Sequence, residues 1–161
     1  MILTGHILIG GAIGVVATTQ FPSPWAVPLS FGLGVLSHHL LDLLPHTDAA
    51  TFWPDPRKVP GVAVLLVTLE VLAGLIMTGT LFMAQHTTWA FAAGALGGIL
   101  PDLFDEMPLW QLRFRNSKLG GAWHRWHCRL HCPDMAARWQ MGLMIDAVVV
   151  GGGLWFLLTV P

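Results

Sequence analysis

The 161-residue sequence contains few charged residues, two cysteines and no tyrosine. Charged residues make up 11% of the chain and hydrophobic residues 54%, whereas an ordinary soluble domain carries about 25% charged residues. This composition excludes an ordinary soluble domain and favours one membrane-embedded domain. The formal net charge of −1 argues against nucleic acid as a partner. Eight tryptophans accompany the absence of tyrosine, and such residues are typical anchors at a membrane interface.

Five long apolar runs predict an all-α, polytopic membrane protein that forms a single domain over residues 1–161. The runs cover about residues 3–20, 25–44, 61–83, 89–107 and 141–160, and each is close to the roughly 20 residues that a spanning helix needs. Residues 108–140 form a long polar stretch before the last run. We expect this stretch to be a cytoplasmic amphipathic segment. Glycines at Gly10-x-x-x-Gly14 and at 94–98 predict close helix packing.

The basic residues all fall on one side of this pattern when the runs alternate through a bilayer. They are Arg57, Lys58, Arg113, Arg115, Lys118, Arg125, Arg129 and Arg138. Because cytoplasmic loops carry the excess of Lys and Arg, we expect a bacterial inner-membrane protein with its amino terminus cytoplasmic and its carboxyl terminus outside. Cys128 and Cys132 then face a reducing compartment, so we expect free thiols. A cleavable signal peptide is not expected, because no basic segment precedes the first apolar run.

A weak internal repeat relates residues 31–45 to residues 94–108 at an offset of 63 positions. The overlay places His39 on Asp102 and Asp42 on Asp105, with a proline after each pair. Residues at i and i+3 share a helix face, so the repeat predicts a duplicated helical hairpin. Counting residues back from the far-side turns places one polar residue of each helix at a common depth, about 21–23 Å from the outer boundary at 1.5 Å per residue. These residues are His6, His39, Glu70, Asp102 and Asp146.

Such a gathering of ionisable residues at membrane depth is costly and indicates a functional site. Imidazole and carboxylate ligands inside a helical bundle predict a divalent transition metal, with zinc or manganese favoured, iron allowed and room for two ions. The candidate ligands are His6, His38, His39, Asp42, Asp102, Asp105, His124, His127 and His131. Metal coordination also activates water for hydrolysis near neutral pH, and Glu70 or Glu106 is the candidate general base.

The polar segment carries a second motif, in which three histidines and a cysteine share one face of a helix at i, i+3, i+4 and i+7. They are His124, His127, Cys128 and His131. A short helix on the membrane surface would fold this stripe over the mouth of the bundle. Arg125 and Arg129, one turn apart on that helix, are expected to bind a phosphate or a lipid headgroup.

These motifs resemble those of a bacterial inner-membrane family known as membrane-bound metal-dependent hydrolases. The matching segments are Thr4-Gly5-His6, Ser37-His38 with Asp42, Leu100-Pro101-Asp102 with Asp105, and His124-Arg125 with His127. The chain departs from the family pattern in four respects: Gly5 separates Thr4 from His6, two residues separate Asp102 from Asp105, no Thr-His-Ser follows His124-Arg125, and the Ser-His motif comes second. The resemblance implies a polytopic metal site and hydrolytic activity.

The first expectation for function is a hydrolase that acts on a membrane-associated ester or phosphoester at the cytoplasmic face. One alternative is a di-iron membrane oxygenase or hydroxylase, which the spacing of His124, His127 and His131 allows. Another is a non-enzymatic metal-ion carrier or sensor. Transporters usually bind their substrate near the bilayer midplane, and the polar plane here lies closer to one face. Membrane lipid is the expected partner, and pairing of two chains through the glycine faces stays open.

Overall fold

The structure is a computed structural model that describes residues 3–47, 61–84, 89–107, 109–130 and 138–159. Its regular elements within these ranges are helices, which confirms the all-α prediction. They are α1 (Leu3–Gln20), α2 (Ser23–Asp42), α4 (Gly61–Ala84), α5 (Trp89–Asp105), α6 (Gln111–Asn116), α7 (Lys118–Leu130) and α8 (Trp139–Thr159).

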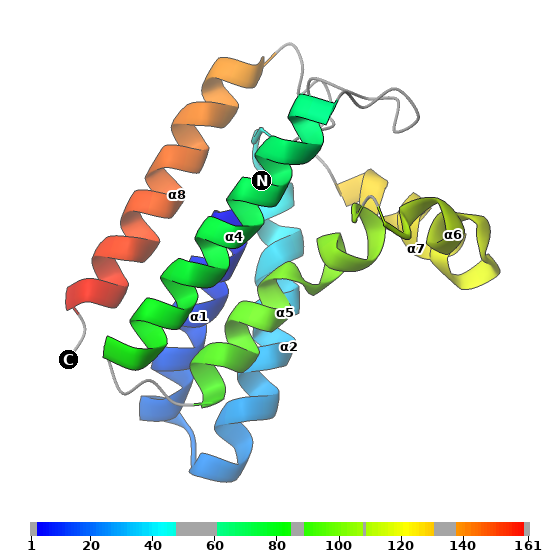
Figure 1. The fold of residues 1–161 in the computed structure, drawn as a ribbon. Helices are drawn as coiled ribbons and strands as arrows, with labels where there is room; N and C mark the ends of the chain where they lie inside the picture. Colours follow the sequence, from blue (N-terminus) through cyan, green and yellow to red (C-terminus); the bar gives the residue numbers. More distant parts are fainter. Residues whose placement is uncertain (1–2, 48–60, 85–88, 108, 131–137, 160–161) are drawn as a thin grey trace.

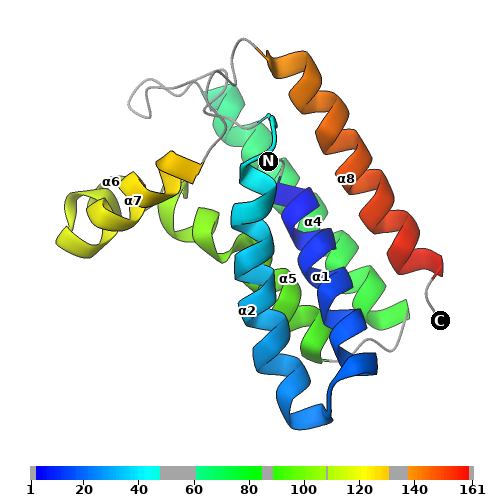
Figure 2. The same cartoon turned by 180° about the vertical axis from the view of Figure 1, so that it is seen from behind.

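The five long helices form one bundle, and the short helices α6 and α7 project sideways near one end of it (Figures 1 and 2). Helices α1, α2 and α5 pack closely against one another, whereas α4 and α8 contact mainly α1. The two predicted hairpins, α1–α2 and α4–α5, therefore differ in packing: α1 and α2 are in close contact, whereas α4 and α5 touch only slightly. The start of α1 and the ends of α2 and α5 lie toward the end of the bundle that carries α6 and α7.

Prolines explain where helix α2 begins and ends. Pro22 precedes α2 and Pro24 lies in its first turn, where a missing backbone N–H removes no hydrogen bond. Helix α2 ends at Asp42, shortly before Pro45, because a residue that precedes proline avoids the α conformation. All five long helices begin and end within about two residues of the expected runs.

Glycines allow the three central helices to touch through their backbones. A Cβ atom added at Gly94 of α5 would overlap the carbonyl oxygen of Gly10 in α1, and one added at Gly34 of α2 would overlap the carbonyl oxygen of Gly94. A Cβ atom at Gly98 would overlap the carbonyl oxygen of His6. The predicted packing role of the glycine faces at 10–14 and 94–98 is confirmed. This close approach brings the polar ends of α1, α2 and α5 together.

Two described helices, α1 and α8, are long and apolar enough to cross a membrane, with 18 and 21 residues. This number is lower than the five expected. Helix α5 has 17 residues, and α2 carries two histidines and an aspartate at its end that lower its hydropathy. Within α4, the stretch Thr68–Met83 is apolar but shorter than a full span.

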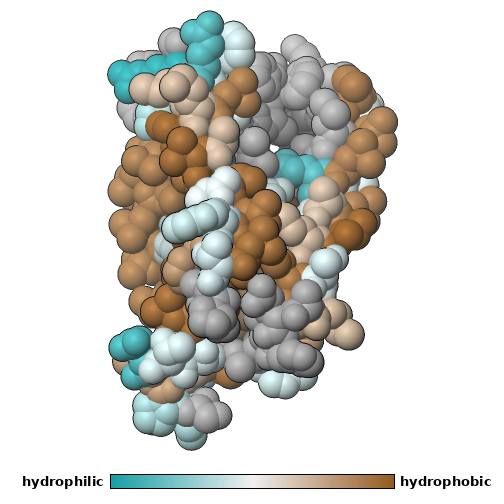
Figure 3. All heavy atoms as spheres, turned by 90° about the vertical axis from the view of Figure 1, so that its left-hand side faces the viewer, coloured by the Kyte–Doolittle hydropathy of each residue, from teal (hydrophilic) through white to brown (hydrophobic). Residues whose placement is uncertain are grey.

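The outer faces of α2, α4 and α8 expose large apolar side chains. Figure 3 shows a broad hydrophobic band across the side of the bundle, with hydrophilic residues toward its ends. Large exposed apolar patches are rare on soluble monomers and usually mark a surface that contacts a membrane, another protein or a ligand. Strongly exposed examples include Trp25, Leu40, Leu65, Ile76, Met144, Val148 and Trp155.

Candidate metal centre

Four ionisable side chains from three helices converge near the end of the bundle, and we call them the four-donor cluster. His38 and Asp42 come from α2, Asp102 from α5 and His127 from α7. The side chains of the first two and of His127 are at most 1% exposed, and that of Asp102 is 17% exposed. The two long helices are fixed by the glycine contacts described above, and the carboxyl-terminal end of α7 approaches the last part of α2 from the side (Figure 2).

The donor atoms of this cluster are spaced like the ligands of one metal ion. His38 Nε2 lies 3.0 Å from Asp42 Oδ2 and 3.4 Å from Asp102 Oδ1. His127 Nε2 lies 3.2 Å and 3.7 Å from the same two oxygens, and 3.2 Å from His38 Nε2. A tetrahedral site with bonds of about 2.0–2.1 Å separates its ligand atoms by about 3.3–3.4 Å. Five of the six distances among the four atoms thus scatter around this value.

The other ring nitrogen of each histidine is held by an acceptor. His38 Nδ1 lies 2.8 Å from the carbonyl oxygen of Gly98, and His127 Nδ1 lies 3.1 Å from Asp105 Oδ2. Both oxygens accept hydrogen bonds, so each Nδ1 carries a proton, and each ring in its neutral form would present an Nε2 lone pair to the cluster. Carbonyl or carboxylate partners of this kind orient histidines that bind metals. Four acceptor atoms thus converge, and positive charge among them, from a proton or a metal ion, is needed for stability.

The pKa of His127 also reflects the carboxylates that surround its ring. Burial favours the neutral imidazole, but hydrogen bonds to Asp105 and Asp42 outweigh it and raise the pKa of His127 to about 10. A metal ion would compete with this proton, since only the deprotonated Nε2 can bind it.

Two further predicted ligands, His6 and His39, lie beside the cluster. His6 Nε2 is 3.3 Å from Asp42 Oδ1, and its ring stacks on that of His38 with 4.1 Å between centroids. His39 packs edge-on against Trp126 at 4.5 Å. Ligand atoms of His38, His39, Asp42 and His127 lie within 4.8 Å of one another, as do those of His6, His38 and Asp102. Six of the nine predicted ligands are therefore brought together.

Asp105 and His124, which the sequence also predicts as ligands, lie one step away from the four donor atoms. Asp105 is fully buried and accepts hydrogen bonds from His127, from His124 at 2.9 Å and from Arg115 at 3.0 Å. Arg115 also pairs with Glu106 at 2.7 Å. Asp105 therefore orients His127 rather than facing the cluster. Sequence reasoning missed the role of Arg115, because no local spacing connects it to an aspartate ten positions earlier.

Asp146 of α8 fixes the segment that follows α2. Its Oδ2 accepts hydrogen bonds from the Thr47 amide at 2.9 Å and the Thr47 hydroxyl at 2.5 Å. His46, in the same segment, donates from Nδ1 to the Leu44 carbonyl at 2.8 Å, and its Nε2 lies 3.9 Å from Asp42 Oδ1. The sequence predictions assigned no role to Asp146 and left His46 out of the ligand set. The signal for His46 was its position four residues after Asp42.

The remaining predicted residues lie away from the four donor atoms or outside the described residues. Glu70 accepts a hydrogen bond from the Thr4 amide at 3.4 Å at the start of α1, and Glu106 is 45% exposed in its pair with Arg115. Arg125 and Arg129 are exposed on α7. The prediction for His131 concerns a residue outside the described part of the chain, as does the one for Cys132.

Cys128 is an exposed free cysteine, as predicted. Its Sγ lies 3.6 Å from His124 Nδ1, on the side of α7 that faces Asp105. Partial burial, together with the nearby carboxylates of Asp105 and Glu106, raises the pKa of the Cys128 thiol. Cys128 is therefore held as a neutral thiol, a poorer metal ligand than a thiolate.

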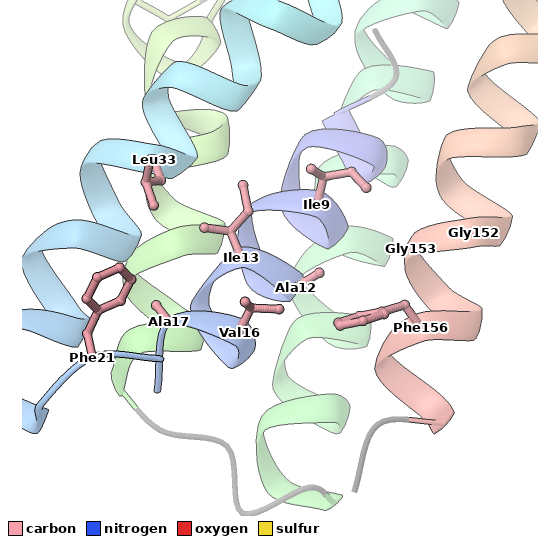
Figure 4. A pocket seen from close by; sticks show the side chains of 10 residues that line it. All are labelled: Ile9, Ala12, Ile13, Val16, Ala17, Phe21, Leu33, Gly152, Gly153 and Phe156. Carbon is pink, nitrogen blue, oxygen red and sulfur yellow. The ribbon is translucent and has the colours of Figure 1, made fainter. Parts of the chain in front are cut away.

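An apolar groove of about 490 Å³ lies between α1, α2 and α8, apart from the metal centre (Figure 4). Its walls include Ile13, Val16, Phe21, Leu33 and Phe156. None of the residues of the four-donor cluster lines it. The groove therefore adds no polar group to the candidate site.

Comparison of the chain with protein-family models, with curated proteins and with solved structures finds no match. Inference about function therefore depends on the geometry described above.

Proposed function

We propose that this protein is a membrane-embedded, metal-dependent hydrolase whose ion is held by His38, Asp42, Asp102 and His127. The observation that carries the proposal is the convergence of two Nε2 atoms and two carboxylate oxygens at separations of 3.0–3.7 Å. Two imidazoles and two carboxylates suit zinc or manganese and allow iron, whereas calcium and magnesium prefer oxygen ligands alone.

The membrane setting is supported by the apolar surface of the bundle. In the proposed arrangement α1, α2, α4, α5 and α8 all span the inner membrane, with the four-donor cluster near the cytoplasmic face. The α6–α7 region fits an interfacial position, because exposed Trp110 and Trp126 accompany basic residues there. Arg125 and Arg129 would attract anionic headgroups or a phosphate of the substrate.

The chemistry follows from the donor set. A divalent ion held there would polarise a carbonyl or phosphoryl oxygen and acidify a water molecule. Hydrolysis joins the water oxygen to the carbon or phosphorus atom, breaks the ester bond and returns a proton to the departing alcohol. Asp102 is the most exposed member of the cluster, so the substrate would approach from its side. Glu70 and Glu106, the general bases expected from the sequence, are instead bound to the Thr4 amide and to Arg115.

The test uses the full chain, purified in detergent and loaded with zinc or manganese. Hydrolysis of a fluorogenic lipid phosphoester and of the matching carboxylic ester would be measured in mixed micelles, together with bound metal. Asp102→Asn and His127→Ala are expected to lose both activity and metal, whereas exposed Gln20→Ala should keep both. Activity that persists in metal-free protein, or in both cluster variants, contradicts the proposal.

A non-enzymatic metal carrier or sensor is the second candidate, and one observation favours it. Four protein donors complete a tetrahedral shell, whereas catalytic zinc sites usually have three protein ligands and one open position. Metal uptake into proteoliposomes without hydrolysis of either ester would select a carrier. Hydrolysis that depends on Asp102 would select the enzyme.

A further inference from the structure

We infer that Asp42 is a bridging carboxylate and that His6 and His46 hold a second metal ion on its Oδ1 side. The inference rests on the proposed function in one respect, because it presupposes a first ion in the four-donor cluster. It adds a ligand, His46, that lies outside the helices and outside the predicted ligand set.

The two oxygens of Asp42 face different imidazoles. Oδ2 lies 3.0 Å from His38 Nε2 and 3.2 Å from His127 Nε2. Oδ1 lies 3.3 Å from His6 Nε2 and 3.9 Å from His46 Nε2. Sites with two metals place the ions about 3.5–4 Å apart, a separation that the two oxygens of one carboxylate can span. Asp42 thus has the position of a bridge between two pairs of histidines.

The ring of His46 is oriented in the same way as the rings of the first site. Its Nδ1 donates to the Leu44 carbonyl at 2.8 Å, so Nε2 is the ring nitrogen that is turned toward Asp42 Oδ1. The 3.9 Å between these two atoms is longer than a hydrogen bond and leaves room for a metal ion that binds both.

His6 supplies an independent observation. Its side chain is fully buried, and neither ring nitrogen has a hydrogen-bond partner among the described residues. Buried polar groups without partners are rare, because leaving water without a new hydrogen bond is costly. A metal ion bound at Nε2, 3.3 Å from Asp42 Oδ1, would give the ring the partner that it lacks.

Helix α8 holds the segment that carries His46 in place. Asp146 binds the amide and hydroxyl of Thr47, and Gly142 lets the backbone of His46 approach closely, since an added Cβ would lie 2.8 Å from its carbonyl carbon. Thr47 and Asp146 are therefore positioning residues for the second site.

The experiment loads the purified, metal-free chain with Mn²⁺ alone and measures bound manganese by elemental analysis and by electron paramagnetic resonance. Wild type is expected to bind two ions per chain with an exchange-coupled spectrum. His46→Ala should bind one ion and give the spectrum of isolated Mn²⁺. Gln20→Ala is the control, since Gln20 is exposed at the last position of α1, and it should keep the coupled spectrum. If His46→Ala does not fold, His6→Asn replaces it with the same expected outcome.

The possible failures are distinguishable. Wild type that binds one ion, with His46→Ala unchanged from it, overturns the second site and leaves the first. Folded His46→Ala that binds no ion overturns the assignment of His46 to a separate site. Wild type that binds no ion contradicts the proposed function as well.

Discussion

Metal affinity at the four-donor cluster should depend steeply on pH, because His127 must lose a proton to bind. Its pKa in the metal-free protein is raised to about 10, so the imidazole is protonated throughout the neutral range. The apparent affinity for Zn²⁺ should therefore rise about tenfold for each pH unit between pH 6 and 8.5, from this one group. A competition titration with a chromophoric chelator, corrected for the chelator's own protonation, measures the slope.

Asp105→Asn separates proton competition from ligand orientation. The substitution removes the charge that helps to raise the pKa of His127, so the pH slope should flatten in the upper part of the window. Loss of the orienting carboxylate should at the same time weaken binding by about 10–100-fold once proton competition is absent. At pH 7 the two effects oppose each other. A flat wild-type slope, or an unchanged slope in Asp105→Asn, would refute the reasoning.

Three further predictions concern packing, the α8 anchor and the interface. Gly94→Ala should destabilise the protein by about 1–3 kcal/mol or more, because its Cβ would overlap the backbone of the facing helix. Gly79→Ala, with open space around it, should not destabilise the protein, and equal melting temperatures for the two variants would contradict this. Asp146→Ala should cost about 1–3 kcal/mol, because the Thr47 amide loses its acceptor, and an unchanged melt would argue against an anchoring role. Arg125→Ala with Arg129→Ala should reduce retention of anionic lipid in native mass spectrometry, by about 1 kcal/mol per charge; equal retention would exclude these residues as headgroup contacts.

Helix positions were largely predictable, because long apolar runs and prolines are local signals. The all-helical class, the glycine faces and the limits of α1 follow from the sequence alone. The number of membrane-spanning helices was harder to predict. Helix α2 is hydrophobic at its start but ends in His38, His39 and Asp42. Its sequence alone does not distinguish a helix that spans a membrane from one that buries a polar site.

Ligand types were predictable, but their geometry was not. His38, Asp42 and Asp102 were expected among the ligands, and their side chains do converge. The repeat predicted equal roles for Asp42 and Asp105, yet Asp105 turns toward His124 and Arg115 on the far side of His127. That difference arises from the α6–α7 segment, which supplies Arg115 and His124 as partners of Asp105. Counting residues along a helix predicts the depth of a side chain but not the direction in which it points, so it could not distinguish the role of Asp42 from that of Asp105.

The proposal of a metal ion held by His38, Asp42, Asp102 and His127 is tested most directly by X-ray absorption at the zinc edge of the loaded, purified protein. The predicted spectrum contains only nitrogen and oxygen neighbours at about 2.0–2.1 Å, with scattering from imidazole rings that decreases in His127→Ala. A shell containing sulfur at about 2.3 Å, or a spectrum identical in wild type and His127→Ala, would contradict it.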